Sequence, residues 1–232
     1  MSYRTSAARS AFRERSGKLR RSFRYAKVRP LALPGDIRQL VFHASVFHLS
    51  AALEDYLLQS LTAWMFEVQR RTGANTLLPT RLRKFLFLKA NEGTLRNLVV
   101  TGSEKEALDR MDGPHSGLVW LRDSDLVPNY RFYDPAIRDK KFPSVDNMDA
   151  LFRRFGIDNI IDKMSRKSRS DVALTLKSFI DVRNSIAHEA PPELTEDDLE
   201  RHFGSVDRWV SLIDRILHSQ VIRASGRDYW QV

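Results

Sequence analysis

The chain has 232 residues, of which 42% are hydrophobic and none is cysteine. A chain of this length can bury a core of its own, whereas disulfide scaffolds, zinc ribbons, iron–sulfur clusters and thiol nucleophiles are excluded because they need cysteine. Its longest apolar runs are far shorter than the ~20 residues that cross a bilayer, so we expect a cytoplasmic protein that does not enter a membrane.

The net charge of +9 comes from the first segment of the chain. Residues 1–30 contain ten lysines and arginines and one carboxylate, Glu14, so the remaining residues sum to zero. Such a basic stretch is typical of an arm that contacts nucleic-acid phosphates. An arginine-rich, acid-poor start also resembles an organelle targeting peptide.

Apolar residues in this basic segment recur at helical spacing. Phe12, Leu19, Phe23 and Ala26 follow steps of seven, four and three, which predicts an amphipathic helix with a narrow apolar stripe. We therefore expect residues 1–30 to form a helix or arm that packs on a second unit, residues 31–232. The segment's candidate RNA-binding residues are Arg13, Arg20, Arg21 and Arg24.

A long helix is predicted from just after Gly35 to about Thr72. Apolar residues from Leu40 to Val68 follow alternating steps of four and three, which is the spacing of a buried helix face. Glu54 occupies one position of this stripe. A carboxylate there needs a partner, because burying an isolated charge costs several kcal/mol.

Two further helices are predicted on either side of a less regular region. One runs from Thr80 to Val100 and divides into two pieces if Gly93 breaks it. The other begins at Ser144, a good N-cap residue, and ends at Phe155 before a glycine.

Repeated glycines and prolines predict an irregular insertion over residues 101–143. Residues 118–121 and 130–133 are candidates for two short strands of a β-hairpin. The aromatic and basic side chains of the insertion either pack on the helices or contact single-stranded RNA. Lys140 and Lys141 are the RNA-binding candidates in this segment.

The last helix has the clearest pattern. Thr195 with Asp198 three residues later resembles a capping box. Beyond it the apolar residues keep steps of four and three: Leu199, Phe203, Val206, Val210, Ile213, Leu217 and Val221. The predicted fold class is therefore all-α, a bundle of four to five main helices with one insertion.

A second charge interrupts an apolar stripe just before the last helix. Val172, Leu176 and Phe179 keep the helical rhythm, and Arg183 takes the following position. Pairing Arg183 with Glu54 is the simplest way to bury both charges. The pair is either a structural salt bridge or a carboxylate that orients a working arginine.

His188 follows Arg183 by five residues and lies at the end of the same helix, because Pro191 and Pro192 cannot continue it. Five residues correspond to about 140° around a regular helix. A frayed last turn and a long arginine side chain would bring the guanidinium and the imidazole to one phosphate. Taken alone, a histidine here is better explained by capping of the helix than by catalysis.

The run from Arg183 to His188 resembles the motif of the HEPN superfamily: an arginine, usually followed by a polar residue, and then a histidine after four to six intervening residues. The run from Phe47 to Leu58, the prolines after the motif helix and the amphipathic last helix resemble its RiboL-PSP-like branch, over residues 36–222. The resemblance implies a helical bundle and a metal-independent endoribonuclease that often works as a homodimer in prokaryotic toxin–antitoxin or antiphage defence systems.

The resemblance also assigns roles to residues. His188 would serve as general base or acid, Arg183 would stabilise charge on the phosphorane, and Asn184 would assist. Glu54 would support the site, and the cleaved RNA would carry a 2′,3′-cyclic phosphate.

No cofactor and no metal are expected, since His43 and His48 lack the spacing of a helical metal pair. RNA, a second copy of the chain and a neutralising or defence-system protein are the expected partners. The alternative is a catalytically inactive module that binds RNA, a nucleotide or a protein.

Overall fold

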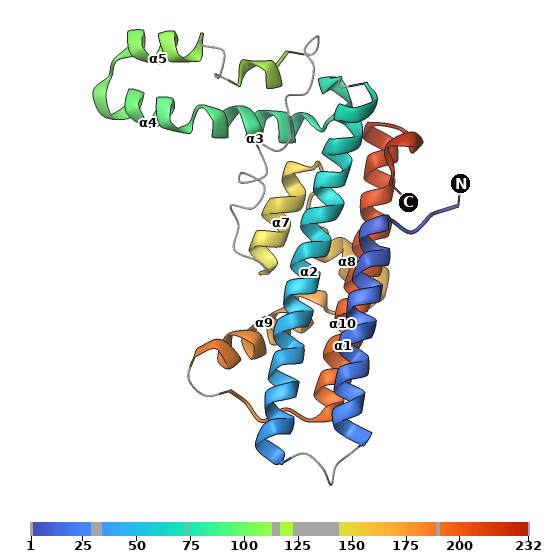
Figure 1. The fold of residues 1–232 in the computed structure, drawn as a ribbon. Helices are drawn as coiled ribbons and strands as arrows, with labels where there is room; N and C mark the ends of the chain where they lie inside the picture. The colour runs from blue at the N-terminus through green and yellow to red at the C-terminus, as the bar shows by residue number, and fades with distance from the viewer. Residues whose placement is uncertain are drawn as a thin grey trace.

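The computed structural model describes residues 2–28, 34–72, 74–112, 117–122, 144–188 and 191–231, with the backbone alone at residues 26–28 and 188. No strand occurs in these residues, which confirms the all-α prediction (Figure 1). The helices are α1 (Ala7–Val28), α2 (Gly35–Arg71), α3 (Thr80–Ala90), α4 (Glu92–Thr101), α5 (Glu104–Met111), α7 (Val145–Arg154), α8 (Ile160–Ser168), α9 (Val172–His188) and α10 (Glu196–Ala224). Three 3₁₀ turns are η1 (Asn75–Leu77), η2 (Leu118–Trp120) and η4 (Arg227–Tyr229).

The three longest helices, α1, α2 and α10, run side by side and form the spine of the molecule (Figure 1). Local signals set the ends of these and other helices. Thr195 and Asp198 form the predicted capping box at the start of α10. Ser144 caps α7 by accepting a hydrogen bond from the Asn147 N–H at 3.1 Å.

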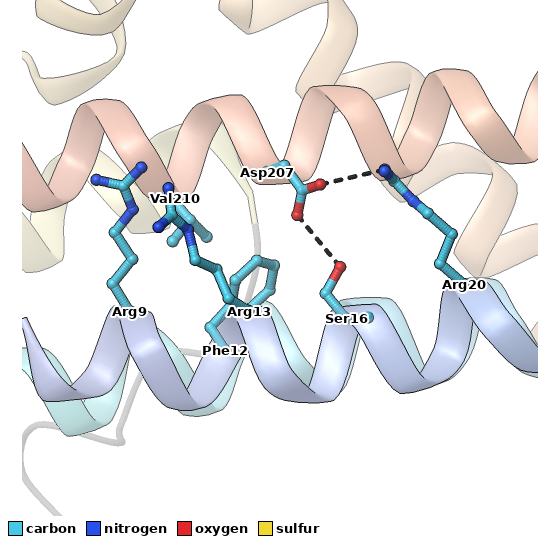
Figure 2. A pocket seen from close by; sticks show the side chains of 8 residues that line it. Arg9, Phe12, Arg13, Ser16, Arg20, Asp207 and Val210 are labelled. Atoms are coloured by element: carbon cyan, nitrogen blue, oxygen red, sulfur yellow. Dashed lines mark hydrogen bonds and ion pairs between the residues drawn. The ribbon is translucent and has the colours of Figure 1, made fainter. Parts of the chain in front are cut away.

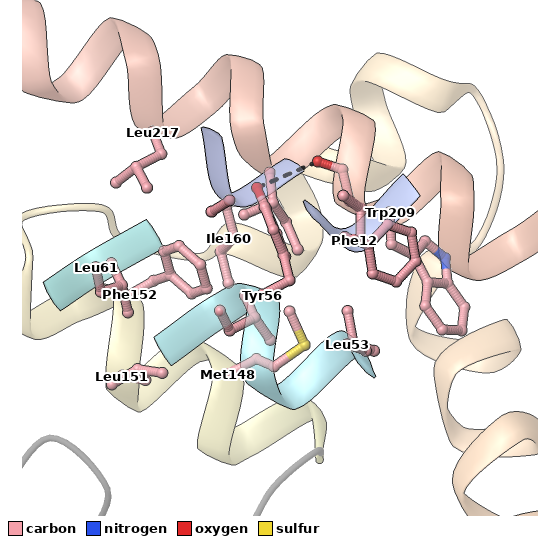
Figure 3. Close-up of a cluster of buried hydrophobic side chains, with 14 of the residues drawn as sticks. Phe12, Leu53, Tyr56, Leu61, Met148, Leu151, Phe152, Ile160, Trp209 and Leu217 are labelled. Atoms are coloured by element: carbon pink, nitrogen blue, oxygen red, sulfur yellow. Dashed lines mark hydrogen bonds between the residues drawn. The ribbon is translucent and has the colours of Figure 1, made fainter. Parts of the chain in front are cut away.

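The core lies where α2 and α10 meet α7, α8 and the first half of α9. Figure 3 shows side chains from several helices converging there, among them Tyr56, Phe152, Ile160 and Leu217, all at most 1% exposed. The Tyr56 hydroxyl donates to the Val210 carbonyl at 3.3 Å. Apolar burial of this extent is the main stabilising contribution to the bundle.

Helix α1 belongs to this bundle, because its apolar stripe is covered. Phe12 and Phe23 are 3% and 1% exposed. The Phe12 ring contacts Tyr56 of α2, and the Phe23 ring lies between Phe42 and Phe203. The basic segment is therefore an amphipathic helix that packs with its apolar side on α2 and α10.

A buried carboxylate ties the start of the chain to α10. Asp214 is 0% exposed and accepts hydrogen bonds from the Ser6 N–H at 3.2 Å, the Ser6 hydroxyl at 2.5 Å and the Tyr56 hydroxyl at 3.2 Å. It also accepts one from the Tyr3 hydroxyl, which in turn accepts from the Arg9 guanidinium at 2.5 Å. The two buried charges, Arg9 and Asp214, thus compensate each other through a phenol.

Helices α3 and α4 project away from the spine, and α5 folds back beside α4 (Figure 1). The stretch predicted over residues 80–100 is indeed two helices, but the break falls at Asn91 and not at Gly93. Asn91 is 1% exposed and its side-chain amide donates to the Phe87 carbonyl at 2.9 Å, which ends α3.

The predicted insertion is more regular than expected at its start, because α5 forms within residues 101–143. The predicted strand over residues 118–121 is wrong. Gly117 adopts φ 69°, and the Trp120 N–H donates to its carbonyl at 3.0 Å, so η2 forms in place of a strand. The second predicted strand, residues 130–133, lies outside the described residues.

Within the described residues, no helix is both long and apolar enough to cross a membrane.

Candidate functional site

Arg183 lies on the surface of α9, in the half of that helix that extends beyond the core. Val172, Leu176 and Phe179 are at most 1% exposed, whereas Arg183 is half-buried. Its guanidinium carbon is 5.3 Å from the centre of the Phe47 ring on α2. One of its terminal nitrogens donates to the Asn184 side-chain carbonyl at 3.1 Å.

The predicted ion pair between Glu54 and Arg183 does not form. Glu54 is half-buried, and no ion pair of it is present among the described residues. From Leu40 to Leu58 the predicted stripe lies at the edge of the covered face of α2, since Leu40 is 64% exposed and Glu54 and Leu58 are half-buried. The centre of that face is a neighbouring stripe that contains Phe42, Val46, Leu49, Leu53 and Tyr56. A carboxylate at the edge keeps its water and needs no partner.

Helix α9 remains regular up to His188, whose backbone closes its last turn. Arg183 and His188 are therefore about 7.5 Å apart along the helix axis and about 140° apart around it. The His188 side chain lies outside the described residues. Asn184, next to Arg183, is exposed and accepts the guanidinium hydrogen bond described above.

Three α2 side chains, spaced four residues apart, hold the end of α9 and the chain that follows it. Phe47 supports Arg183. The His43 Nε2 atom lies 2.9 Å from the Pro192 carbonyl, so that nitrogen carries the hydrogen. The Gln39 amide bonds both backbone groups of Leu194, at 2.9 Å and 3.0 Å.

The sequence had not pointed to this supporting stripe, since His43 was considered there only as a metal ligand. The available signal was the i, i+4 spacing of three side chains that can bond or stack, beside an otherwise exposed half of a helix.

The candidate RNA-binding arginines of α1 divide into two kinds. Arg20 pairs with Asp207 at 3.1 Å, and Arg24 pairs with Glu200 at 3.3 Å, so both charges are largely neutralised. Arg13 and Arg21 are exposed, and within the described part of the chain neither has an ion pair. Lys140 and Lys141 lie outside the described residues.

The buried carboxylates in the described part of the chain are Glu67 and Asp214, and the sequence pattern had identified neither as buried. Glu67 on α2 has a side chain 7% exposed and bonds to Arg70 at 2.8 Å, Arg71 at 3.0 Å and Gln231 at 2.7 Å. These hydrogen bonds, above all that from Arg70, lower the pKa of Glu67 to about 2. Among the described residues, no group of three or more His, Asp and Glu side chains is arranged to hold a metal ion.

The fold is an all-helical bundle, and its next-to-last long helix carries an arginine followed five residues later by a histidine at the helix end. This is the architecture of a HEPN domain. The model of the RiboL-PSP-HEPN family matches residues 26–219, so the chain belongs to that family. No curated protein and no solved structure matches the chain.

Proposed function

We propose that the protein is a metal-independent endoribonuclease that cleaves RNA by attack of a ribose 2′-hydroxyl on the adjacent phosphate. The observation that carries the proposal is the placement of Arg183. Its charge is half-exposed, it has no carboxylate partner among the described residues, and it is held by Phe47 on the helix that ends at His188. An arginine held in this way is available to a phosphate.

Each residue of the motif has a role that its chemistry allows. Arg183 would bind the phosphate and stabilise the charge of the phosphorane. His188 would take the proton of the 2′-hydroxyl or donate one to the leaving 5′-oxygen. Asn184, bonded to Arg183 at 3.1 Å, would orient the guanidinium. The products would carry a 2′,3′-cyclic phosphate and a 5′-hydroxyl.

One protomer supplies one histidine, whereas this reaction is best served by both an acid and a base. We therefore include a homodimer in the proposal, with the two motifs facing a common groove. An exposed apolar residue beside Phe47 fits such an interface, because Leu40 lies seven residues before Phe47 on the same face of α2 and is 64% exposed.

The biological setting belongs to the same proposal. A ribonuclease of this family would act as a toxin or as an antiphage-defence component, and it would then need a neutralising or regulating partner. The competing function is a module that binds RNA without cutting it, which the unpaired arginines of α1 would equally support.

The test is cleavage of a labelled single-stranded RNA by the full chain, with and without a chelator. We expect cleavage that the chelator leaves unchanged and that His188→Ala abolishes, with the helical circular dichroism signal retained. Arg183→Lys should lose most of the activity, because a lysine cannot form the bidentate contact of a guanidinium with phosphate.

The binding module is distinguished by the same samples. Intact RNA after long incubation, together with salt-sensitive RNA binding, would replace the nuclease by the inactive module. Full activity in the His188→Ala protein would remove the proposed mechanism altogether.

A further inference from the structure

A groove of about 290 Å³ runs between α1 and α10, on a different side of α2 from Arg183. Four polar side chains of α1 reach toward it at steps of four, three and four residues, which places them on one face of the helix. Figure 2 shows them together with the facing residues of α10. The residues that the argument uses are Arg9, Arg13, Ser16, Arg20 and Asp207.

One end of the groove is electrically balanced. Asp207 accepts a hydrogen bond from the Arg20 guanidinium at 3.1 Å and from the Ser16 hydroxyl at 3.2 Å (Figure 2). Arg20 is also 3.7 Å from a Glu200 carboxylate oxygen. At this end, the charge of Arg20 is therefore already neutralised by Asp207 and Glu200.

The other end carries a net positive charge, because it has two arginines, Arg9 and Arg13, and only the Asp214 carboxylate to balance them among the described residues. Arg9 is 6% exposed, and its direct partners are two neutral hydroxyls, Tyr3 at 2.5 Å and Ser211 at 2.8 Å. Asp214 reaches Arg9 only through the Tyr3 hydroxyl. Arg13 lies beside Arg9 and has no ion pair in the part of the chain that the structure describes (Figure 2).

We propose that this end of the groove is a binding site for a phosphate group, with Arg9 as a fixed wall and Arg13 as the side chain that closes on the ligand. Two guanidinium groups offer parallel N–H donors that fit the oxygens of a phosphate, and a guanidinium that is already buried loses little further hydration when an anion arrives. The phosphate belongs to a single-stranded RNA or to a free nucleotide.

This site does not depend on the proposed nuclease activity. Helix α1 packs on the side of α2 that carries Phe42 and Tyr56, whereas Arg183 packs on Phe47. An RNA held at the groove would be anchored away from the place of cleavage. Loss of the groove should therefore weaken binding without changing the rate at saturating RNA.

The experiment uses the full chain and a short labelled 2′-O-methyl RNA, which cannot be cut through its 2′-oxygen, with binding followed by fluorescence anisotropy. Arg13→Gln should weaken RNA binding about tenfold. It should also reduce the slope of log K against log salt concentration by about one. Arg21→Gln is the matched control, because it removes the same charge from an exposed position of the same helix outside the groove. Equal losses of RNA affinity in the two variants would mean that the RNA is held by the overall positive charge of α1, which would overturn the site.

A second variant predicts a gain. Asp207→Asn removes the carboxylate that neutralises Arg20, so binding should become several-fold tighter; unchanged or weaker binding counts against the proposal.

Competitors then identify the source of the phosphate. Pyrophosphate or ATP should displace the RNA from the wild type at concentrations that do not displace it from the Arg13→Gln variant, and this result would support the site. Tight ATP binding together with weak RNA binding would assign the site to a nucleotide. Displacement by polyglutamate as effective as that by pyrophosphate would show a general anion surface and refute a phosphate site.

Discussion

The side-chain amide of Gln39 on α2 bonds both backbone groups of Leu194: it donates to the carbonyl at 2.9 Å and accepts from the N–H at 3.0 Å. Leu194 lies in the connection between α9 and α10, six residues after His188. The N-terminal half of α2 thereby fixes the chain that leaves the motif helix, which gives α2 a part in positioning the site.

Gln39→Glu should test this pair of hydrogen bonds with little change in side-chain shape. A carboxylate still accepts from the Leu194 N–H but cannot donate to its carbonyl, so one hydrogen bond becomes a repulsion. We expect a loss of about 1 kcal/mol in the free energy of unfolding and a fall in RNA cleavage at unchanged RNA affinity. Urea unfolding and single-turnover cleavage measure the two effects. Cleavage equal to that of the wild type would mean that the connection does not position the motif.

Phe47→Leu should lower cleavage about twofold to fivefold, because the stacking of a guanidinium on an aromatic ring contributes about 0.5–1 kcal/mol. Phe66→Leu is the matched control, since Phe66 is a 37% exposed aromatic residue of the same helix and lies about 28 Å further along it. Identical cleavage rates in the two variants would show that Phe47 does not hold Arg183 in its working position.

Glu54→Gln should change little. Because Glu54 has no ion pair in the described structure and is half-buried, we expect a change below about 0.5 kcal/mol in the free energy of unfolding. Cleavage should likewise be retained. A loss above about 2 kcal/mol in chemical unfolding would restore the buried-pair interpretation that the geometry of Arg183 contradicts.

Asp214→Asn should be among the most destabilising conservative changes in the chain. It leaves Arg9 without its compensating charge and replaces acceptor lone pairs with N–H donors that face the hydroxyls of Tyr3, Ser6 and Tyr56. Burial raises the pKa of Tyr56, and the neighbouring Asp214 carboxylate raises it further, so the phenol stays a donor. We expect a loss of about 2–4 kcal/mol in urea unfolding.

The control for Asp214 lies on the same helix. Asp207→Asn alters a half-buried carboxylate seven residues earlier, and its cost should stay below about 1 kcal/mol. Comparable losses in the two variants would contradict the assignment of the buried network.

Glu67 should make the stability depend on pH. Its folded-state pKa of about 2 is below the ordinary value of 4.5. As the pH falls, the unfolded chain therefore takes up the proton first, so the stabilisation is complete above about pH 4.5 and is lost towards pH 2. Glu67→Gln should cost roughly 1–3 kcal/mol at pH 7.

The measurement is the difference in unfolding free energy between wild type and Glu67→Gln at several pH values. This difference should shrink as the pH drops below 4.5. A difference that stays constant down to pH 3 would mean that the carboxylate is not stabilised by Arg70 and Arg71.

Local sequence determined the long helices of the bundle and several of their ends. The capping box at Thr195, the cap at Ser144 and the long α2 helix were all predictable, because a cap and a stripe of apolar residues depend only on neighbours within a few positions. The motif helix ends at His188 for the same reason, since the prolines that follow cannot continue it.

Tertiary structure alone decided which charges are buried. Glu54 and Glu67 lie on the same helix in similar apolar surroundings along the sequence, yet only Glu67 is covered, because the chain end with Gln231 lies against it. Asp214 is covered by the N-terminal segment and α2, and Arg183 escapes burial because the second half of α9 extends past the core. Periodicity defines a face of a helix, but the burial of that face depends on elements that are distant in the chain and close in space.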